Sequence, residues 1–251
     1  MIILIMIVFA LATFATWAFV KQTTTRIVLG SVLMVLLALS VVGLTLNFSN
    51  HFGMEKVSTT KESKVYSASS ASPAGMLITQ RLGTKADNYV LVYSKTADAK
   101  KPTTFGVPDK KHISTAVNER TTYRLTDKTT ATAKTVTTRW EWKNDFYRIM
   151  FGVGGQGGEI AKRVKTVYVP KTTWVVLTAE QAKQMQASQA AAQSNPTVAA
   201  AQQAQMKTAV EAKVAAYMQA NPQASQSQIQ AATKTATAEV AAQAIKQSLA
   251  Q

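Results

Sequence analysis

The chain has 251 residues, no cysteine, two histidines and a formal net charge of +15 at pH 7. The lack of cysteine excludes disulfides, thiolate nucleophiles and cysteine-based metal sites. His51 and His112 lie far apart, and no cluster of acidic residues accompanies either of them. We therefore expect no metal site, no cofactor and no catalytic residue, so the sequence favours a protein that is not an enzyme. Its length suits one or two domains.

Two uncharged, apolar runs occupy the first fifty residues. They cover residues 2–20 and 27–48, and the short segment between them contains Lys21 and Arg26. At about 1.5 Å per residue, the first run forms a helix of roughly 28 Å, close to the ~30 Å hydrocarbon core of a bilayer. We therefore predict a transmembrane hairpin over residues 1–48. The alternative, a cleaved signal peptide, requires a basic segment before a shorter apolar run.

The charges of the connecting loop predict the orientation of this hairpin. Lys21 and Arg26 place the loop in the cytoplasm under the positive-inside rule, so both termini and the soluble domain lie outside the plasma membrane. Neither apolar run contains an ionisable side chain. Pumps and carriers usually need such groups within the membrane, so we interpret the hairpin as an anchor in the lipid bilayer.

A tether and a β domain are predicted to follow. Residues 49–75 are rich in Ser, Thr, Lys and Ala, which is typical of a flexible tether. Residues 76–178 are predicted to form a small, basic, mostly antiparallel β domain, either a barrel or a sandwich. Segments dense in β-branched and aromatic residues predict its strands. These segments are residues 88–95, 121–125, 135–151, 164–169 and 174–177.

A glycine-rich segment within this domain fits the pattern G-x-G-x-x-G through Gly152, Gly154 and Gly157. A dinucleotide-binding loop of this pattern must be preceded by a strand and followed by a helix. Residues 160–169 instead alternate in the manner of a strand, and Pro170 ends the run. We therefore predict a turn between two strands, in which glycine supplies positive φ angles.

Positive charge is concentrated in the middle of the chain. Residues 51–178 contain 21 Lys and Arg against 10 Asp and Glu. Such a field raises the local concentration of polyanions. We therefore predict a binding or scaffolding module for anionic envelope polymers or for an acidic partner protein in the same membrane. The predicted contacts combine local charge density with loop or strand-edge positions, and they are Lys110, Lys111, Arg163 and Lys165.

Two alternative functions remain. Trp140 and Trp142 lie two residues apart on one side of a strand, where core packing is the commoner role. If they stacked on bases instead, the protein would capture nucleic acid, which is the less favoured partner. A wall-remodelling hydrolase is the weaker alternative. Its candidate carboxylates are Glu119, Glu141, Asp145 and Glu159.

The C-terminal tail, residues 179–251, is rich in Ala and Gln. Thr178 and Gln181 have the spacing of a capping box, and two Asn-Pro pairs interrupt the tail further on. We predict three helices, over residues 178–193, 197–220 and 225–249. Two interpretations stay open for them. The tail either forms coiled-coil contacts with a partner or remains a partly disordered, low-complexity segment.

Three features together resemble a known family. They are the hairpin with its Lys21 and Arg26 turn, the segment W-E-W-K-N-D-F-Y-R-I-M-F-G at 140–152, and the segment from Thr166 through Trp174 to Lys183. They are similar to a family of small two-pass membrane proteins of Gram-positive bacteria, known as a domain of unknown function. The resemblance covers residues 1 to about 185. It implies a bacterial plasma membrane beside a wall of anionic polymers, and it implies no catalytic residues.

Overall fold

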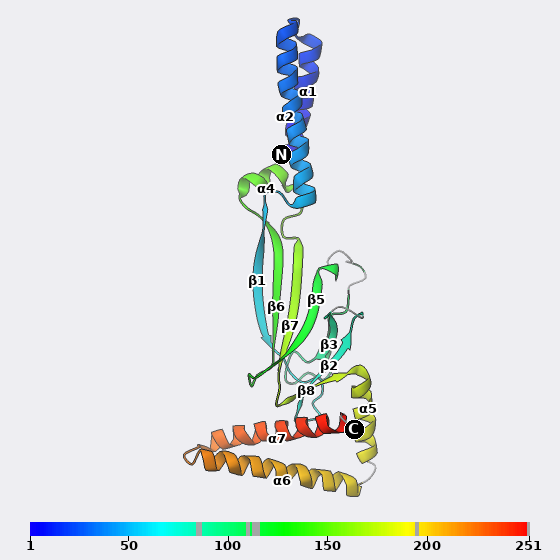
Figure 1. The fold of residues 1–251 in the computed structure, drawn as a ribbon, viewed down its shortest axis with the longest axis vertical. Helices are drawn as coiled ribbons and strands as arrows, with labels where there is room; N and C mark the ends of the chain where they lie inside the picture. Colours follow the sequence, from blue (N-terminus) through cyan, green and yellow to red (C-terminus); the bar gives the residue numbers. More distant parts are fainter. Residues whose placement is uncertain (84–86, 109–110, 112–115, 194–195, 250–251) are drawn as a thin grey trace. The chain divides into compact units, whose positions relative to one another are not determined.

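The structure is a computed structural model. It describes residues 1–83, 87–108, 111, 116–193 and 196–249. The chain divides into two compact units, and Figure 1 shows its course. Unit 1 consists of residues 1–59 and 137–162, and unit 2 consists of residues 60–136 and 163–251.

Two apolar helices, α1 (Ile2–Phe19) and α2 (Thr23–Asn50), run side by side in unit 1 (Figure 1). Most of their large apolar side chains are exposed. Both helices are long and apolar enough to cross a membrane. Hydroxyl groups along them, such as that of Thr16, donate to carbonyl oxygens one turn earlier, which satisfies these groups without water. The predicted pair of helices is therefore present.

In the described part of the chain, eight strands form two four-stranded sheets. The first sheet has the order β1-β6-β7-β5, from β1 (Met54–Lys64), β6 (Thr132–Trp142), β7 (Ile160–Pro170) and β5 (Glu119–Thr126). The second has the order β4-β3-β2-β8, from β4 (Thr103–Phe105), β3 (Tyr89–Tyr93), β2 (Gly75–Arg81) and β8 (Trp174–Thr178).

Both sheets are mixed, which corrects the prediction of a mostly antiparallel domain, and neither closes into a barrel. β2 is antiparallel to β3 but parallel to β8, and β5 is parallel to β7. The parallel pair β2–β8 arises because the chain leaves the first sheet after β7 and enters the second as β8. Strands that follow each other in the chain therefore need not be neighbours in a sheet. A prediction from sequence alone tends to place consecutive strands side by side.

One apolar cluster lies between the two sheets of unit 2. Its members from the first sheet alternate along β7 and across the start of β6, which Ala131 directly precedes, as expected for strands with one buried face. These members are Ala131, Ala133, Val167 and Val169. The members from the second sheet are Leu77, Leu91, Tyr93 and Trp174. This cluster holds the two sheets together face to face.

A second apolar cluster covers the other face of the second sheet. Met76 of β2 and Leu177 of β8 pack there against Ala241 and Ala242 of α7 (Gln226–Leu249). The helix α5 (Ala179–Gln193) contributes Met185 to the same cluster. Because successive side chains of a strand point to opposite faces, a strand covered on both faces reads as a continuous apolar run. This explains the sequence W-V-V-L at the start of β8.

The C-terminal helices are thus part of the fold. The capping box that begins α5 is present: the Thr178 nitrogen donates to Gln181 Oε1 at 2.9 Å, and the Gln181 nitrogen donates to Thr178 Oγ1 at 3.1 Å. α6 (Pro196–Ala220) lies alongside α7 (Figure 1), and Lys213 and Glu239 form an ion pair between them. The three helices match their predicted ranges. Within the described residues the tail is helical, and α7 buries alanines against the sheet; the coiled-coil interpretation stays a prediction.

Two further elements differ from expectation. β1 occupies residues 54–64, within the predicted tether, and all its side chains after Met54 are exposed. No apolar alternation marks this strand, since pairing with β6 rather than burial of side chains forms it. The helix α4 (Asp145–Phe151) lies where the sequence predicted a strand. Asn144 begins it by accepting a hydrogen bond from the Tyr147 nitrogen at 3.2 Å, as an N-cap residue does.

The packing of α7 gives the first testable prediction. Ala242 is fully buried, whereas Ala231 of the same helix is exposed. Because extra methylene groups overpack a filled core, Ala242→Leu should lower the free energy of unfolding by about 1–3 kcal/mol. Ala231→Leu should change it by no more than about 0.5 kcal/mol. Denaturant titration of both variants, followed by circular dichroism, checks this. Equal stability of the two variants would contradict the packing of α7 on the sheet.

Candidate functional site

Arg163, one of the predicted polymer contacts, lies on β7 and is engaged inside the first sheet. It is the register neighbour of Glu119 on β5, and its guanidinium donates to the Glu119 carboxylate. Its backbone nitrogen donates to the Asn118 oxygen at 2.9 Å. The Arg163 charge is therefore matched by a carboxylate of the neighbouring strand. This pairing weakens the attraction of Arg163 for an external anion.

Lys165, the next predicted contact along β7, faces the cluster between the sheets. It lies on the same side of the strand as the buried Val167. Its Nζ atom is 3.7 Å from the Phe105 ring centroid and 5.4 Å from that of Tyr93. Burial lowers the pKa of Lys165 to about 8, and the nearby Lys95 adds to the effect. The Phe105 ring acts in the opposite direction, because its π face attracts the ammonium group.

The remaining predicted contacts lie elsewhere. Lys111 is exposed in the segment between β4 and β5. Lys110 lies outside the described residues. The structure thus brings Arg163 and Lys165 together on one strand, but on its core-facing side. Their half-buried environment was not evident from sequence, because Lys162, Arg163 and Lys165 surround the single Val164 and hide the apolar alternation of the strand.

The two tryptophans of the nucleic-acid alternative are half-buried in unit 1. The Trp140 ring is stacked on His51, with 4.0 Å between centroids and 8° between planes, and the Lys56 ammonium lies 4.8 Å from its centroid. Trp142 fills the space beside Gly157, where a Cβ would approach its Nε1 within 2.7 Å. One face of Trp140 is therefore already occupied by another ring.

The glycine-rich segment connects β6 to β7, as predicted, through α4 and a short 3-10 helix, η1 (Gly152–Gly154). Gly155 and Gly158 have φ angles of 67° and 82°, so this turn uses the positive φ that glycine allows. A strand and not a helix follows, as β7 shows. The arrangement lacks the helix start that a dinucleotide phosphate requires.

The carboxylates of the hydrolase alternative are partly engaged in ion pairs. Glu119 pairs with Arg163, and Asp145 pairs with Arg148. Within the described residues, no group of three or more His, Asp or Glu is placed to hold a metal ion.

Burial raises the pKa of the Tyr93 hydroxyl above its usual range, which keeps this hydroxyl protonated.

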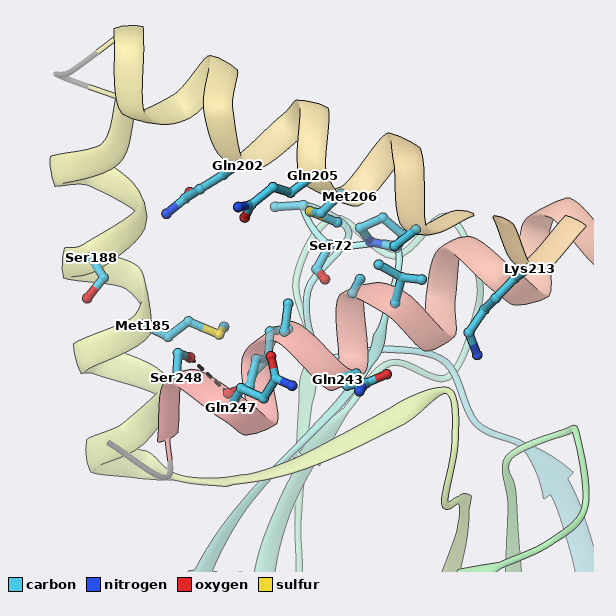
Figure 2. A pocket seen from close by; sticks show the side chains of 17 residues that line it. Ser72, Met185, Ser188, Gln202, Gln205, Met206, Lys213, Gln243, Gln247 and Ser248 are labelled. Atoms are coloured by element: carbon cyan, nitrogen blue, oxygen red, sulfur yellow. Dashed lines mark hydrogen bonds between the residues drawn. The ribbon is translucent and has the colours of Figure 1, made fainter. Parts of the chain in front are cut away.

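Unit 2 contains a groove with a defined lining. It has a volume of about 850 Å³ and lies between α5, α6, α7 and the segment 71–73 (Figure 2). Figure 2 shows Gln202 and Gln205 on α6 facing Met185 on α5 and Gln247 on α7. This size falls within the ~300–1,000 Å³ of typical small-ligand pockets.

The groove combines thioether and alkyl groups with amides and hydroxyls. Met185 and Met206 supply adaptable apolar surface. Among the described lining residues, Lys213 alone is ionisable, and its ammonium group is paired with Glu239. Such a lining can hold a ligand by hydrogen bonds and apolar contact, but it offers no acid–base pair for catalysis. Sequence analysis missed the groove, because helices from three segments form it.

Comparison with known protein families identifies one match. Residues 22–185 match a domain of unknown function (DUF4811). The chain belongs to this family. No curated protein and no solved structure matches the chain. The DUF4811 region runs from the start of α2 to the middle of α5 and includes all eight described strands. It ends at Met185, so α6 and α7, which form two walls of the groove, lie beyond it.

The environment of Lys165 gives the second prediction. Its pKa is about 8 in the folded chain and about 10.5 ordinarily, so the unfolded chain binds more protons between these values. The stability of the native chain relative to Lys165→Met should therefore rise as pH increases from 8 to 10, and should be constant below pH 7. Lys162→Met, which changes an exposed residue of the same strand, is the control. Denaturant unfolding at four pH values measures the difference. A pH-independent difference would contradict the buried position of Lys165.

Proposed function

We propose that the chain is a membrane-anchored binding or scaffolding module of the cell envelope and not an enzyme. Its anchor consists of α1 and α2. Its ligand is an anionic envelope polymer or an acidic partner protein in the same membrane. The membrane is the plasma membrane of a Gram-positive bacterium, and the soluble part lies on its outer side.

The observation that carries this proposal is the excess of exposed positive charge. Residues 51–178 contain 21 Lys and Arg against 10 Asp and Glu. Four of the ten acidic residues are engaged in ion pairs, with Arg120, Arg148, Arg163 and Lys171. Many of the lysines are exposed to solvent. They include Lys61, Lys64, Lys100, Lys101, Lys128, Lys143 and Lys162. An unbalanced field of this kind attracts polyanions.

The orientation is supported by Lys21, between the two helices, and by Arg26, in the first turn of α2. Because the chain contains no cysteine, single cysteines can report on it directly. In intact cells, Ala97→Cys in the soluble part should react with a membrane-impermeant maleimide. Thr24→Cys, near the helix connection, should react only after the cells are permeabilised. The reverse pattern would contradict the orientation and leave the two membrane helices intact.

Charge-driven binding gives a further prediction. Binding of the full chain in zwitterionic nanodiscs to polyglycerol phosphate should weaken as salt rises, since the Debye length shrinks from ~10 Å at 0.1 M to ~3 Å at 1 M. Replacing Lys110 and Lys111 by alanine should weaken binding roughly 30-fold at low salt, from about 1 kcal/mol for each lysine. Replacing Lys183 and Lys234, which removes the same charge from the tail, should have a smaller effect.

The same titration distinguishes the alternatives. Replacing Arg163 and Lys165 should change the affinity little, because both charges are engaged within the fold. Tighter binding to single-stranded DNA, lost in Trp140→Ala, would favour nucleic-acid capture. Release of fragments from wall material, abolished by Glu141→Gln, would favour a hydrolase. If no polyanion binds at low salt, the proposal fails.

A further inference from the structure

The helix α4 and the turn η1 are fastened to the C-terminal end of α2 in unit 1. Phe151, the last residue of α4, is buried, and a Cβ on Gly43 of α2 would lie 3.7 Å from its Cζ. On η1, a Cβ on Gly154 would lie only 2.8 Å from the ring of Phe48. These contacts join α4 and η1 to the last two turns of α2.

The turn that follows α2 strengthens this attachment. His51 ends the helix with a left-handed backbone, and the Asn47 side-chain amide donates to the Phe52 oxygen at 2.7 Å. The Phe52 ring makes edge contacts with Tyr147 and Phe151 of α4, with centroids 5.7 and 6.1 Å apart. Because aromatic packing of this kind fixes ring orientation, α4 is held in a defined position at the helix end.

The beginning of α1 meets the same place. The Met1 nitrogen donates to the Ile149 oxygen at 3.0 Å and lies 3.4 Å from the Met150 oxygen. Figure 1 accordingly shows the N-terminus beside α4. The start of α1, the end of α2 and α4 therefore lie at one level along the helical hairpin.

One side of α4 and η1 remains exposed although it is apolar. Phe146, Ile149 and Val153 are 63%, 56% and 58% exposed. Phe146 and Ile149 are three residues apart and lie on one face of α4, and Val153 follows them on η1. The charged residues Asp145 and Arg148 pair with each other on the same short helix. The segment is thus amphipathic, with one face on α2 and another uncovered.

Helix length sets the depth of this face in a bilayer. The apolar part of α2, residues 27–48, spans about 33 Å, close to the ~30 Å hydrocarbon core. Phe48 then lies near the boundary between acyl chains and headgroups, and η1 contacts Phe48 directly. Phe48 and Phe52 are themselves about half exposed, so the uncovered apolar surface continues from α2 onto α4.

The residues around α4 have the composition of a membrane interface. Tyr147 is part of α4, and Trp142 ends β6 three residues before it; such rings are enriched at headgroup level. Lys143, at the start of the segment, is exposed, and basic side chains near the surface favour anionic lipids. The exposed apolar side chains, their level near the end of α2 and the basic Lys143 therefore all suit contact with a lipid bilayer.

We propose that α4 and η1 form an interfacial element, with the face of Phe146, Ile149 and Val153 inserted into the headgroup–acyl boundary of the bilayer that holds α1 and α2. Amphipathic segments lie in this region with their apolar face a few ångströms below the headgroups. The element fixes how the β strands leave the membrane surface, because β6 ends and β7 begins on either side of it. This inference rests on the proposed anchoring of α1 and α2.

Spin labels on single cysteines test the proposal in the full chain. The chain is placed in vesicles of phosphatidylglycerol and phosphatidylcholine, and collisions of the label are measured with O₂, which partitions into lipid, and with a water-soluble nickel chelate. Labels at Phe146→Cys and Ile149→Cys should collide more with O₂ than with nickel. Arg148→Cys, on another side of the same helix, and Val117→Cys, an exposed apolar position of unit 2, should show the opposite ratio.

A label at Leu39→Cys, on the exposed surface of α2, reports on the anchor itself. If the label at residue 39 is in lipid, but the labels at residues 146 and 149 contact water as the label at residue 117 does, the inference is overturned and the proposed anchoring stands. If 146 and 149 are shielded from both reagents, a protein contact covers this face, which also overturns the inference. If residue 39 contacts water, the anchoring and the inference fail together.

Discussion

The fold of unit 2 depends on the burial of both faces of the second sheet. Leu77 and Trp174 pack on one face against the first sheet, and Met76 and Leu177 pack on the other against α5 and α7. Helices cover one face of the second sheet and the first sheet covers the other. A sheet that is buried on both faces must have apolar side chains along the whole of its central strands. The strands of the parallel pair β2–β8 meet this requirement. Their side chains on the helix-covered face pack directly against the C-terminal helices.

This constraint also explains the two polar features of unit 2. Lys165 lies where the cluster between the sheets ends, so its stem is buried and its ammonium rests on Phe105. The groove occurs on the other side of the second sheet, where α5, α6 and α7 do not close completely over the methionines. Neither feature brings together an acid and a base.

Unit 1 follows a different physical rule. Its helices expose most of their apolar side chains, and both are long and apolar enough to cross a membrane. The aromatic residues gather where the helices end, around His51 and Phe52, and link the helix end to the short helix between β6 and β7. The family match extends over this linkage, since residues 22–185 include α2, α4 and both sheets.

The sequence by itself determined the elements whose signals are local. The apolar runs predicted α1 and α2, the capping box at Thr178 predicted the start of α5, and β-branched alternation predicted β3, β5, β7 and β8. Only the tertiary structure decided the rest. β1 and its exposed side chains depend on a partner strand, the parallel pairings depend on where the chain changes sheets, and the environments of Arg163 and Lys165 depend on which strand face is covered. These outcomes arise from contacts between segments distant in sequence, and no local pattern of residues encodes them.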